Sequence, residues 1–107
     1  MAFKRALLRP LADTDLIEAT QYYAREGGRK LGERVFSAAL EALNRIEETP
    51  GIGSTRLGEL CDITDLRAWP VEGFPLRWLY FETENHLDVV RLLGDRQDVL
   101  ALQLTTD

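Results

Sequence analysis

The chain has 107 residues, of which 45% are hydrophobic and 29% are charged, and its formal net charge is −5. This composition predicts one globular domain spanning residues 1–107, and no apolar run approaches the roughly 18 residues that a membrane helix requires. An acidic chain is a poor general nucleic-acid binder, because that affinity comes largely from phosphate neutralisation by lysine and arginine. We expect no direct binding to nucleic acid or membrane, and a cytosolic location.

The cysteine and histidine content excludes two kinds of site. The single Cys61 cannot form an internal disulfide, and together with the single His86 it cannot supply the four ligands of a structural zinc site. The glycines between residues 51 and 58 lack the spacing of a phosphate-binding loop. The sequence therefore predicts no metal site, no cofactor and no catalytic residues.

The N-terminal part predicts a strand followed by a helix. The partly alternating apolar run over residues 3–10 is typical of a strand, which Pro10 would close. Three candidate helix caps follow at residues 13–15, and apolar residues then recur at helical spacing as far as the glycine pair at 27 and 28. We expect a helix over roughly residues 13–26.

A second helix is predicted from Arg29 to about Glu48. Its apolar residues form a broad stripe, which indicates either deep burial within the domain or an additional surface for a partner, and the sequence favours burial. The connection between the two helices is only a pair of glycines. The helices should therefore lie antiparallel as neighbours in an αα-hairpin.

The C-terminal half predicts three strands. Residues 51–64 contain three glycines and no clear period, which is typical of an irregular crossover. Runs with strand character follow at 65–71, 76–82 and 86–93, and the short turns between them favour an antiparallel meander. The middle run is apolar on both faces, so it should be a central strand that is covered on each side.

The tail that begins at Asp98 predicts either a short helix or a final strand, and the sequence favours the helix. The complete order predicts an α+β domain. It consists of an N-terminal strand, an antiparallel helical hairpin packed on an antiparallel sheet of about four strands, and a short C-terminal helix or tail.

Four stretches carry a resemblance to a known family. They are "RPLADTDLIEATQYYAREGG", "TPGIG", "LRAWPVEGFPLRWLYF" and "VVRLLGDRQDVLAL", and they cover nearly the whole chain. In this order and spacing they resemble the ParE/RelE superfamily of toxins from type II toxin-antitoxin modules. The match is closer to the ParE branch than to the RelE branch.

The resemblance implies a function and a partner. It implies a compact toxin whose helical hairpin and sheet bind the C-terminal segment of a cognate antitoxin, forming a hetero-oligomer. The expected antitoxin is a ParD-like, ribbon-helix-helix DNA-binding protein. ParE-like members poison DNA gyrase, whereas RelE-like members cleave messenger RNA in the ribosomal A site.

The C-terminal residues favour the gyrase inhibitor over the nuclease. Metal-free RNA cleavage needs a base, an acid and cations around the developing phosphorane. The segment 67–96 holds four arginines against five acids, no tyrosine or histidine follows His86, and Gly94 stands where many relatives have a histidine. We expect a non-enzymatic, ParE-like inhibitor of gyrase. The alternatives are a RelE-like ribosome-dependent endoribonuclease and a non-toxic member that acts only in the antitoxin complex.

The aromatic residues suggest a binding surface for the antitoxin. Most of them should fill the core, but tyrosine and tryptophan are also favoured anchors of protein interfaces. An amphipathic antitoxin helix would fit a groove along the helical hairpin, and an extended segment could add to a sheet edge. The residues predicted to line that groove are Tyr22, Phe36, Leu40 and Trp69.

The stretch "VVRLLGDRQD" at residues 89–98 admits two interpretations. It is either a charged turn with Asp98 capping a terminal helix, or a patch that faces the target or the antitoxin. Arg91 could pair with Glu82 or Asp98 within the fold. In the second interpretation, Arg91 and Arg96 are the target-binding residues.

Overall fold

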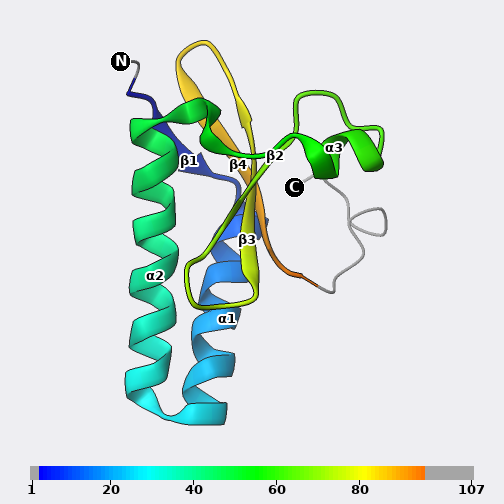
Figure 1. The fold of residues 1–107 in the computed structure, drawn as a ribbon. Helices are drawn as coiled ribbons and strands as arrows, with labels where there is room; N and C mark the ends of the chain where they lie inside the picture. The colour runs from blue at the N-terminus through cyan, green and yellow to red at the C-terminus, as the bar shows by residue number, and fades with distance from the viewer. Residues whose placement is uncertain (1–2, 96–107) are drawn as a thin grey trace.

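The computed structural model describes residues 3–95 (Figure 1). The elements in chain order are β1 (Arg5–Leu8), α1 (Pro10–Gly27), α2 (Arg29–Glu48), the short 3₁₀ helix η1 (Pro50–Ile52), α3 (Arg56–Leu60), β2 (Arg67–Pro70), β3 (Leu76–Glu82) and β4 (His86–Gly94). This order confirms the predicted α+β class. The predicted C-terminal helix lies outside the described residues. No helix among residues 3–95 is long and apolar enough to cross a membrane.

The strands form one four-stranded sheet in the order β1-β4-β3-β2. β2, β3 and β4 make the predicted antiparallel meander, whereas β1 pairs with β4 in parallel, so the sheet is mixed rather than wholly antiparallel. The cause is the helical hairpin, which returns the chain to the end of the sheet where β1 starts. There the backbone N–H of Lys4 donates to the carbonyl of Glu47 at 3.1 Å. β2 therefore runs in the same direction as β1. The two antiparallel pairings of the meander reverse the chain twice, so β4 runs in this direction as well.

Helix α1 begins earlier than predicted. Pro10 is its first helical residue, and the preceding Arg9 makes no side-chain capping bond. Proline suits this position because its ring fixes φ near the helical value and the N–H that it lacks would have no partner there. Pro10 therefore starts a helix as well as ending a strand, and residues 13–15 lie inside the helix instead of capping it.

The turn between the two helices is as short as predicted. Gly28 has a φ of 95°, in the left-handed region that favours glycine, and its N–H donates to the carbonyl of Ala24 at 2.9 Å. Helix α2 runs from Arg29 to Glu48, as the sequence predicts. The two helices lie side by side against one face of the sheet (Figure 1).

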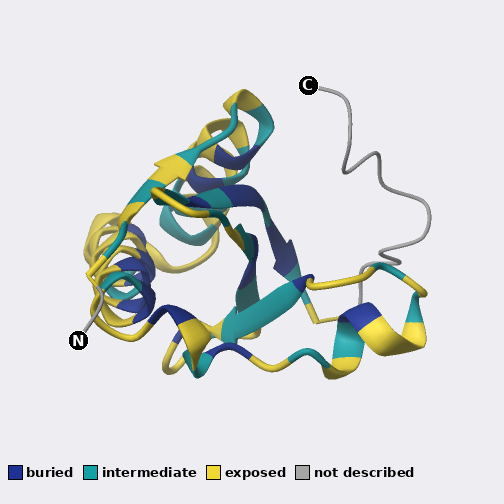
Figure 2. Cartoon of the chain, turned by 90° about the horizontal axis from the view of Figure 1, so that it is seen from above, coloured by how far each residue is buried: buried dark blue, intermediate teal, exposed yellow. Residues whose placement is uncertain are grey.

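The main core lies between this hairpin and the sheet (Figure 2). Trp78 and Tyr80 point from β3 into it and are fully buried. The indole Nε1 of Trp78 donates to the carbonyl of Ala39 at 3.0 Å, which joins the middle of α2 to the sheet. The other fully buried members are Ala12, Ala39, Ile46, Leu87 and Val89.

A second core covers the opposite face of the sheet. Leu79 of β3 and Val90 and Leu93 of β4 are buried there together with Leu66. Helix α3 and the loop after it pack on this cluster through Leu57, Cys61 and Ile63. The segment 51–64 is thus more ordered than the predicted irregular crossover. β3 is a central strand covered on both sides, as its two apolar faces predict.

Tyr80 of β3 connects the η1 turn to the sheet by hydrogen bonds. Its hydroxyl donates to the carbonyl of Pro50 at 2.7 Å and accepts the backbone N–H of Gly53 at 3.0 Å. A Cβ atom at Gly53 would lie 2.6 Å from that hydroxyl, so only glycine permits this close approach. The buried phenol therefore serves as a donor and an acceptor in its protonated form.

We expect Tyr80 to make the stability of the fold depend on alkaline pH. Burial raises the pKa of Tyr80 above its usual 10.0. The unfolded chain then releases this proton at a lower pH than the folded chain does. The contribution is complete below pH 10.0 and is lost as the pH rises through the higher pKa of the folded state. Urea unfolding at pH values from about 8 to about 11 measures this loss.

The matched variant is Tyr80→Phe. It leaves the Pro50 carbonyl and the Gly53 N–H without their partner, which should cost roughly 1–3 kcal/mol at neutral pH. It should also remove part of the alkaline fall in stability, whereas Tyr22→Phe, at a half-exposed ring, should leave both unchanged. An alkaline fall of the same size in Tyr80→Phe as in the native chain would contradict this role for the phenol.

Candidate functional site

The part of β4 that extends beyond β1 meets helix α1. β1 pairs with β4 only as far as Val89. Beyond it, the carboxylate of Asp15 accepts Nε and Nη2 of Arg91 at 2.7 and 2.9 Å and the backbone N–H of Leu92 at 3.0 Å. The side chains of Asp15 and Arg91 are only 12% and 13% exposed. This bidentate ion pair joins α1 to the sheet.

One of the two ion-pair partners predicted for Arg91 is therefore wrong. Glu82 pairs with Lys4 at 2.8 Å rather than with Arg91. Asp98, the other predicted partner, and Arg96 lie outside the described residues. The aspartate that does bind Arg91 comes from 76 residues earlier in the chain, and sequence spacing does not indicate such a contact. The predicted binding of Arg91 to a target remains a prediction.

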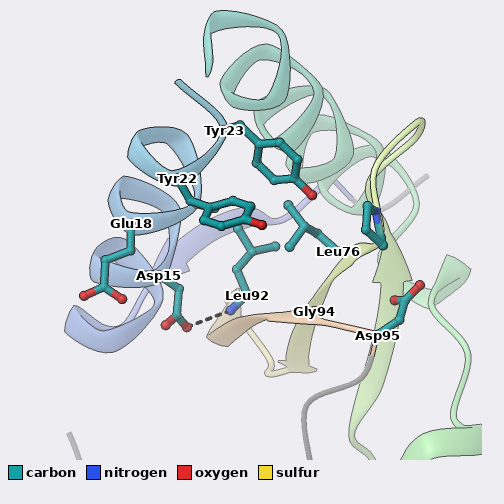
Figure 3. A pocket seen from close by; sticks show the side chains of 10 residues that line it. Asp15, Glu18, Tyr22, Tyr23, Leu76, Leu92, Gly94 and Asp95 are labelled. Carbon is teal, nitrogen blue, oxygen red and sulfur yellow. Dashed lines mark hydrogen bonds between the residues drawn. The ribbon is translucent and has the colours of Figure 1, made fainter. Parts of the chain in front are cut away.

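A groove of about 680 Å³ opens beside this ion pair, between α1 and the ends of β3 and β4 (Figure 3). Leu76 and Leu92 form its apolar part, and Tyr22 and Tyr23 project from α1 on one side. The remaining lining residues are Asp15, Glu18, Ala19, Pro75, Gly94 and Asp95. A volume of this size is within the range of small-ligand and peptide-anchor pockets.

The two tyrosines give the groove an aromatic wall. Their rings pack edge to face with centroids 5.3 Å apart, and Tyr23 packs at the same distance against Phe74. Tyr22 is 51% exposed, while Tyr23 is half-buried. No hydrogen bond joins either hydroxyl to the described residues, so both can take part in binding.

The four residues predicted for the antitoxin groove lie on different surfaces. Tyr22 lines the groove just described, Phe36 lines a hollow between α1 and α2, and Trp69 lines a hollow between α2 and β2. Leu40 is 39% exposed on α2, one turn after Phe36. The structure thus brings Phe36 and Leu40 together and separates them from the two other side chains. The role of all four in antitoxin binding remains a prediction.

The edges of the sheet are less open to strand addition than the sequence suggests. Besides the contact of Leu92 with Asp15, the N–H of Ala6 in β1 donates to the Glu47 carboxylate at 2.8 Å. In β2, Ala68 exchanges both backbone bonds with Ser54 at 2.9 Å. An extended antitoxin segment would have to displace one of these groups.

Two arginines of the strands, which a nuclease could use for catalysis, already bind other groups of this chain. Arg67 donates to the carbonyls of Gly51 and Gly53 at 3.1 and 2.7 Å, and Arg91 is held by Asp15. Arg77 is half-buried, and its Nε has no hydrogen-bond partner within residues 3–95. His86 Nδ1 lies 3.0 Å from the Thr83 hydroxyl in the β3–β4 turn. Residues 3–95 contain no cluster of three or more His, Cys, Asp or Glu side chains that could hold a metal ion.

Comparison with known proteins shows what the fold is similar to. No protein-family model matches the sequence, and no curated protein matches it. Among solved structures, a chain of the "Chromosomal ParDE TA system from P. aeruginosa" superimposes with a TM-score of 0.74. The two chains share one fold. The match covers 88% of this chain and 98% of the ParDE chain at 12% sequence identity.

The ParDE match confirms the resemblance seen in the sequence at the level of the fold. Because it spans 98% of the ParDE chain, the hairpin and the sheet both belong to the shared architecture. At 12% identity, the side chains of the groove must be interpreted from this chain alone.

Sequence reasoning missed most of the groove. The sequence indicates Asp15 only as one of three candidate helix caps, and it does not indicate that Glu18, Leu92 and Asp95 share a surface. One signal was present, because Asp15, Glu18 and Tyr22 are spaced three and four residues apart and must share one face of α1. The sequence does not show that the end of β4 lies beside that face.

Proposed function

We propose that this chain is the toxin of a type II toxin-antitoxin module, that it is ParE-like, and that a cognate antitoxin neutralises it by direct binding. The observation that carries the proposal is the superposition on a ParDE chain with a TM-score of 0.74 over 88% of this chain. The antitoxin would be a ParD-like, ribbon-helix-helix protein that forms a hetero-oligomer with the toxin in the cytoplasm.

We further propose that the toxin inhibits DNA gyrase without catalysis of its own. Two arginines of the C-terminal strands, Arg67 and Arg91, are already engaged by carbonyl groups and by a carboxylate. A guanidinium that is held in this way is poorly placed to neutralise a phosphorane. This supports a protein-binding inhibitor over the RelE-like nuclease.

Two assays with the purified chain separate these activities. The first follows supercoiling of relaxed plasmid by gyrase, and the second follows cleavage of messenger RNA on translating ribosomes. The proposal predicts blocked supercoiling and intact messenger RNA. Cleaved messenger RNA with normal supercoiling would select the nuclease and overturn the gyrase proposal.

The exposed ridge of α2 is our candidate for the contact with an antitoxin helix. Phe36 and Leu40 are 41% and 39% exposed and stand one helical turn apart. Their substitution together, Phe36→Ala/Leu40→Ala, should weaken binding of the antitoxin at least about tenfold, since two large apolar anchors are lost. The circular-dichroism spectrum should stay unchanged because neither side chain is in the core. Calorimetric titration of the native and variant chains measures the difference.

A matched control uses exposed apolar residues elsewhere. Phe3 and Leu60 are 66% and 73% exposed and lie near the start of β1 and on α3, respectively. The variant Phe3→Ala/Leu60→Ala should bind the antitoxin as the native chain does. Equal affinity of the native chain and of Phe36→Ala/Leu40→Ala would exclude this ridge as the antitoxin contact.

A further inference from the structure

The groove between α1 and the end of β4 combines an apolar floor with two carboxylates that make no ion pair within residues 3–95. Leu76 and Leu92 supply the floor. Glu18 and Asp95 line the groove and are exposed. Asp15 is different, because Arg91 already neutralises it. No lysine or arginine lines the groove among residues 3–95.

The rings of Tyr22 and Tyr23 favour an occupant with a positive charge. The face of a phenol ring attracts a cation through its quadrupole, and arginine does so while stacking its planar group on the ring. Both hydroxyls of Tyr22 and Tyr23 also point toward the interior of the groove (Figure 3). Figure 3 shows Glu18 on α1 beside Tyr22, and Asp95 at the opposite end of the groove beyond Gly94. A guanidinium placed against Tyr22 would therefore have the Glu18 carboxylate as its neighbour.

We infer that this groove takes an arginine of the partner protein, which projects from a segment with apolar residues on either side. The flanking apolar residues would contact Leu76 and Leu92. The guanidinium would lie against Tyr22 beside the carboxylate of Glu18, and Asp95 would add negative charge at the other end of the groove. This inference rests on the proposed function in one respect only, since it takes the partner to be the antitoxin. It assigns to that partner a basic anchor, complementary to the net charge of −5 of this chain.

Three peptides test the inference on the full-length chain. The probe is acetyl-Leu-Arg-Leu-amide, and the controls replace its arginine by citrulline, which has nearly the same shape without the charge, or by glutamate. Nuclear magnetic resonance follows the ring signals of Tyr22 and Tyr23 during titration. We expect saturable shifts with the arginine peptide, at least about tenfold weaker binding of the citrulline peptide, and no binding of the glutamate peptide.

A pair of variants tests whether the rim carboxylates are responsible. Glu18→Gln/Asp95→Asn should bind the arginine peptide roughly threefold to tenfold more weakly, as expected for the loss of one exposed ion pair and of a second negative charge at the groove. The control Glu48→Gln/Glu84→Gln removes two exposed carboxylates outside the groove and should bind as the native chain does. An equal loss in both variants would show that net charge alone attracts the peptide and would overturn the inference.

Other occupants are separate outcomes of the same titration. Equal binding of the arginine and citrulline peptides would mean that the groove is an apolar site without a preference for charge. Shifts of the tyrosine signals in Arg96→Gln without any peptide would mean that the chain fills its own groove. Shifts that depend on protein concentration would mean that a second copy does. Each result overturns the inference and leaves the toxin proposal to be judged by the supercoiling assay.

Discussion

Replacement of Asp15 by alanine should destabilise the fold by about 3–5 kcal/mol, because it removes the carboxylate that pairs with a largely buried guanidinium. In the native chain the Asp15 carboxylate accepts three hydrogen bonds, two from Arg91 and one from the N–H of Leu92. Small domains are stable by roughly 5–15 kcal/mol, so the loss is a large part of the total. Urea unfolding followed by circular dichroism measures it.

The matched control is Asp13→Ala. Asp13 lies in the first turn of the same helix but is exposed and has no ion pair in the described part of the chain. Its removal should have a much smaller effect. The double variant Asp15→Ala/Arg91→Ala should recover part of the stability that Asp15→Ala loses, since no unpaired charge remains. Equal stabilities of Asp13→Ala and Asp15→Ala would show that the ion pair contributes little.

This ion pair also changes how toxicity data on Arg91 should be interpreted. Loss of toxicity in Arg91→Ala has two explanations, loss of a target contact and loss of the joint between α1 and β4. The melting temperatures of Arg91→Ala and Asp15→Ala separate them. If both variants are destabilised and both lose toxicity, the structural role of Arg91 suffices to explain the result.

Replacement of Trp78 by alanine should cost about 3–5 kcal/mol, the usual range for removing a large aromatic side chain from a core. Trp78 is fully buried between α2 and the sheet, and its indole donates to the Ala39 carbonyl at 3.0 Å. The variant loses apolar contacts, leaves a cavity and removes the hydrogen bond that the indole adds to the Ala39 carbonyl. Denaturant unfolding in a stabilising osmolyte keeps even a strongly weakened variant measurable.

Two further variants make the role of Trp78 testable even if the alanine variant fails to fold. Trp78→Phe keeps most of the apolar volume and should show a smaller loss of stability. Trp69→Ala, at the half-buried tryptophan of β2, removes the same side chain from the margin of the core and should also cost less. A larger loss for Trp69→Ala than for Trp78→Ala would contradict the placement of the core.

Most of the fold could be predicted from the sequence because its signals are local. The period of apolar residues gives α2, the glycine pair gives the tight turn at Gly28, and the alternation in β3 gives two covered faces. Two local signals are ambiguous or too weak. Pro10 suits both the end of a strand and the first turn of a helix, and the five residues of α3 are too few to show a helical period.

The candidate site could not be predicted in the same way because it depends on contacts between distant residues. The pairing of Asp15 with Arg91 requires knowing that β4 extends beyond the end of β1. The parallel direction of β1 likewise follows from where the hairpin returns the chain. Tyr22 and Phe36 are exposed, as a binding role for them requires. They lie on different surfaces because of the way the two helices pack on each other and on the sheet, which the sequence does not show.

The most direct test of the proposed function is growth of bacteria in which this chain is induced alone or together with the product of the adjoining gene. The account predicts that induction alone arrests growth, that the arrested cells contain relaxed plasmid and intact messenger RNA, and that the second protein restores growth by forming a stable complex. Normal growth during accumulation of the folded, soluble chain would contradict the proposal that this protein is a toxin.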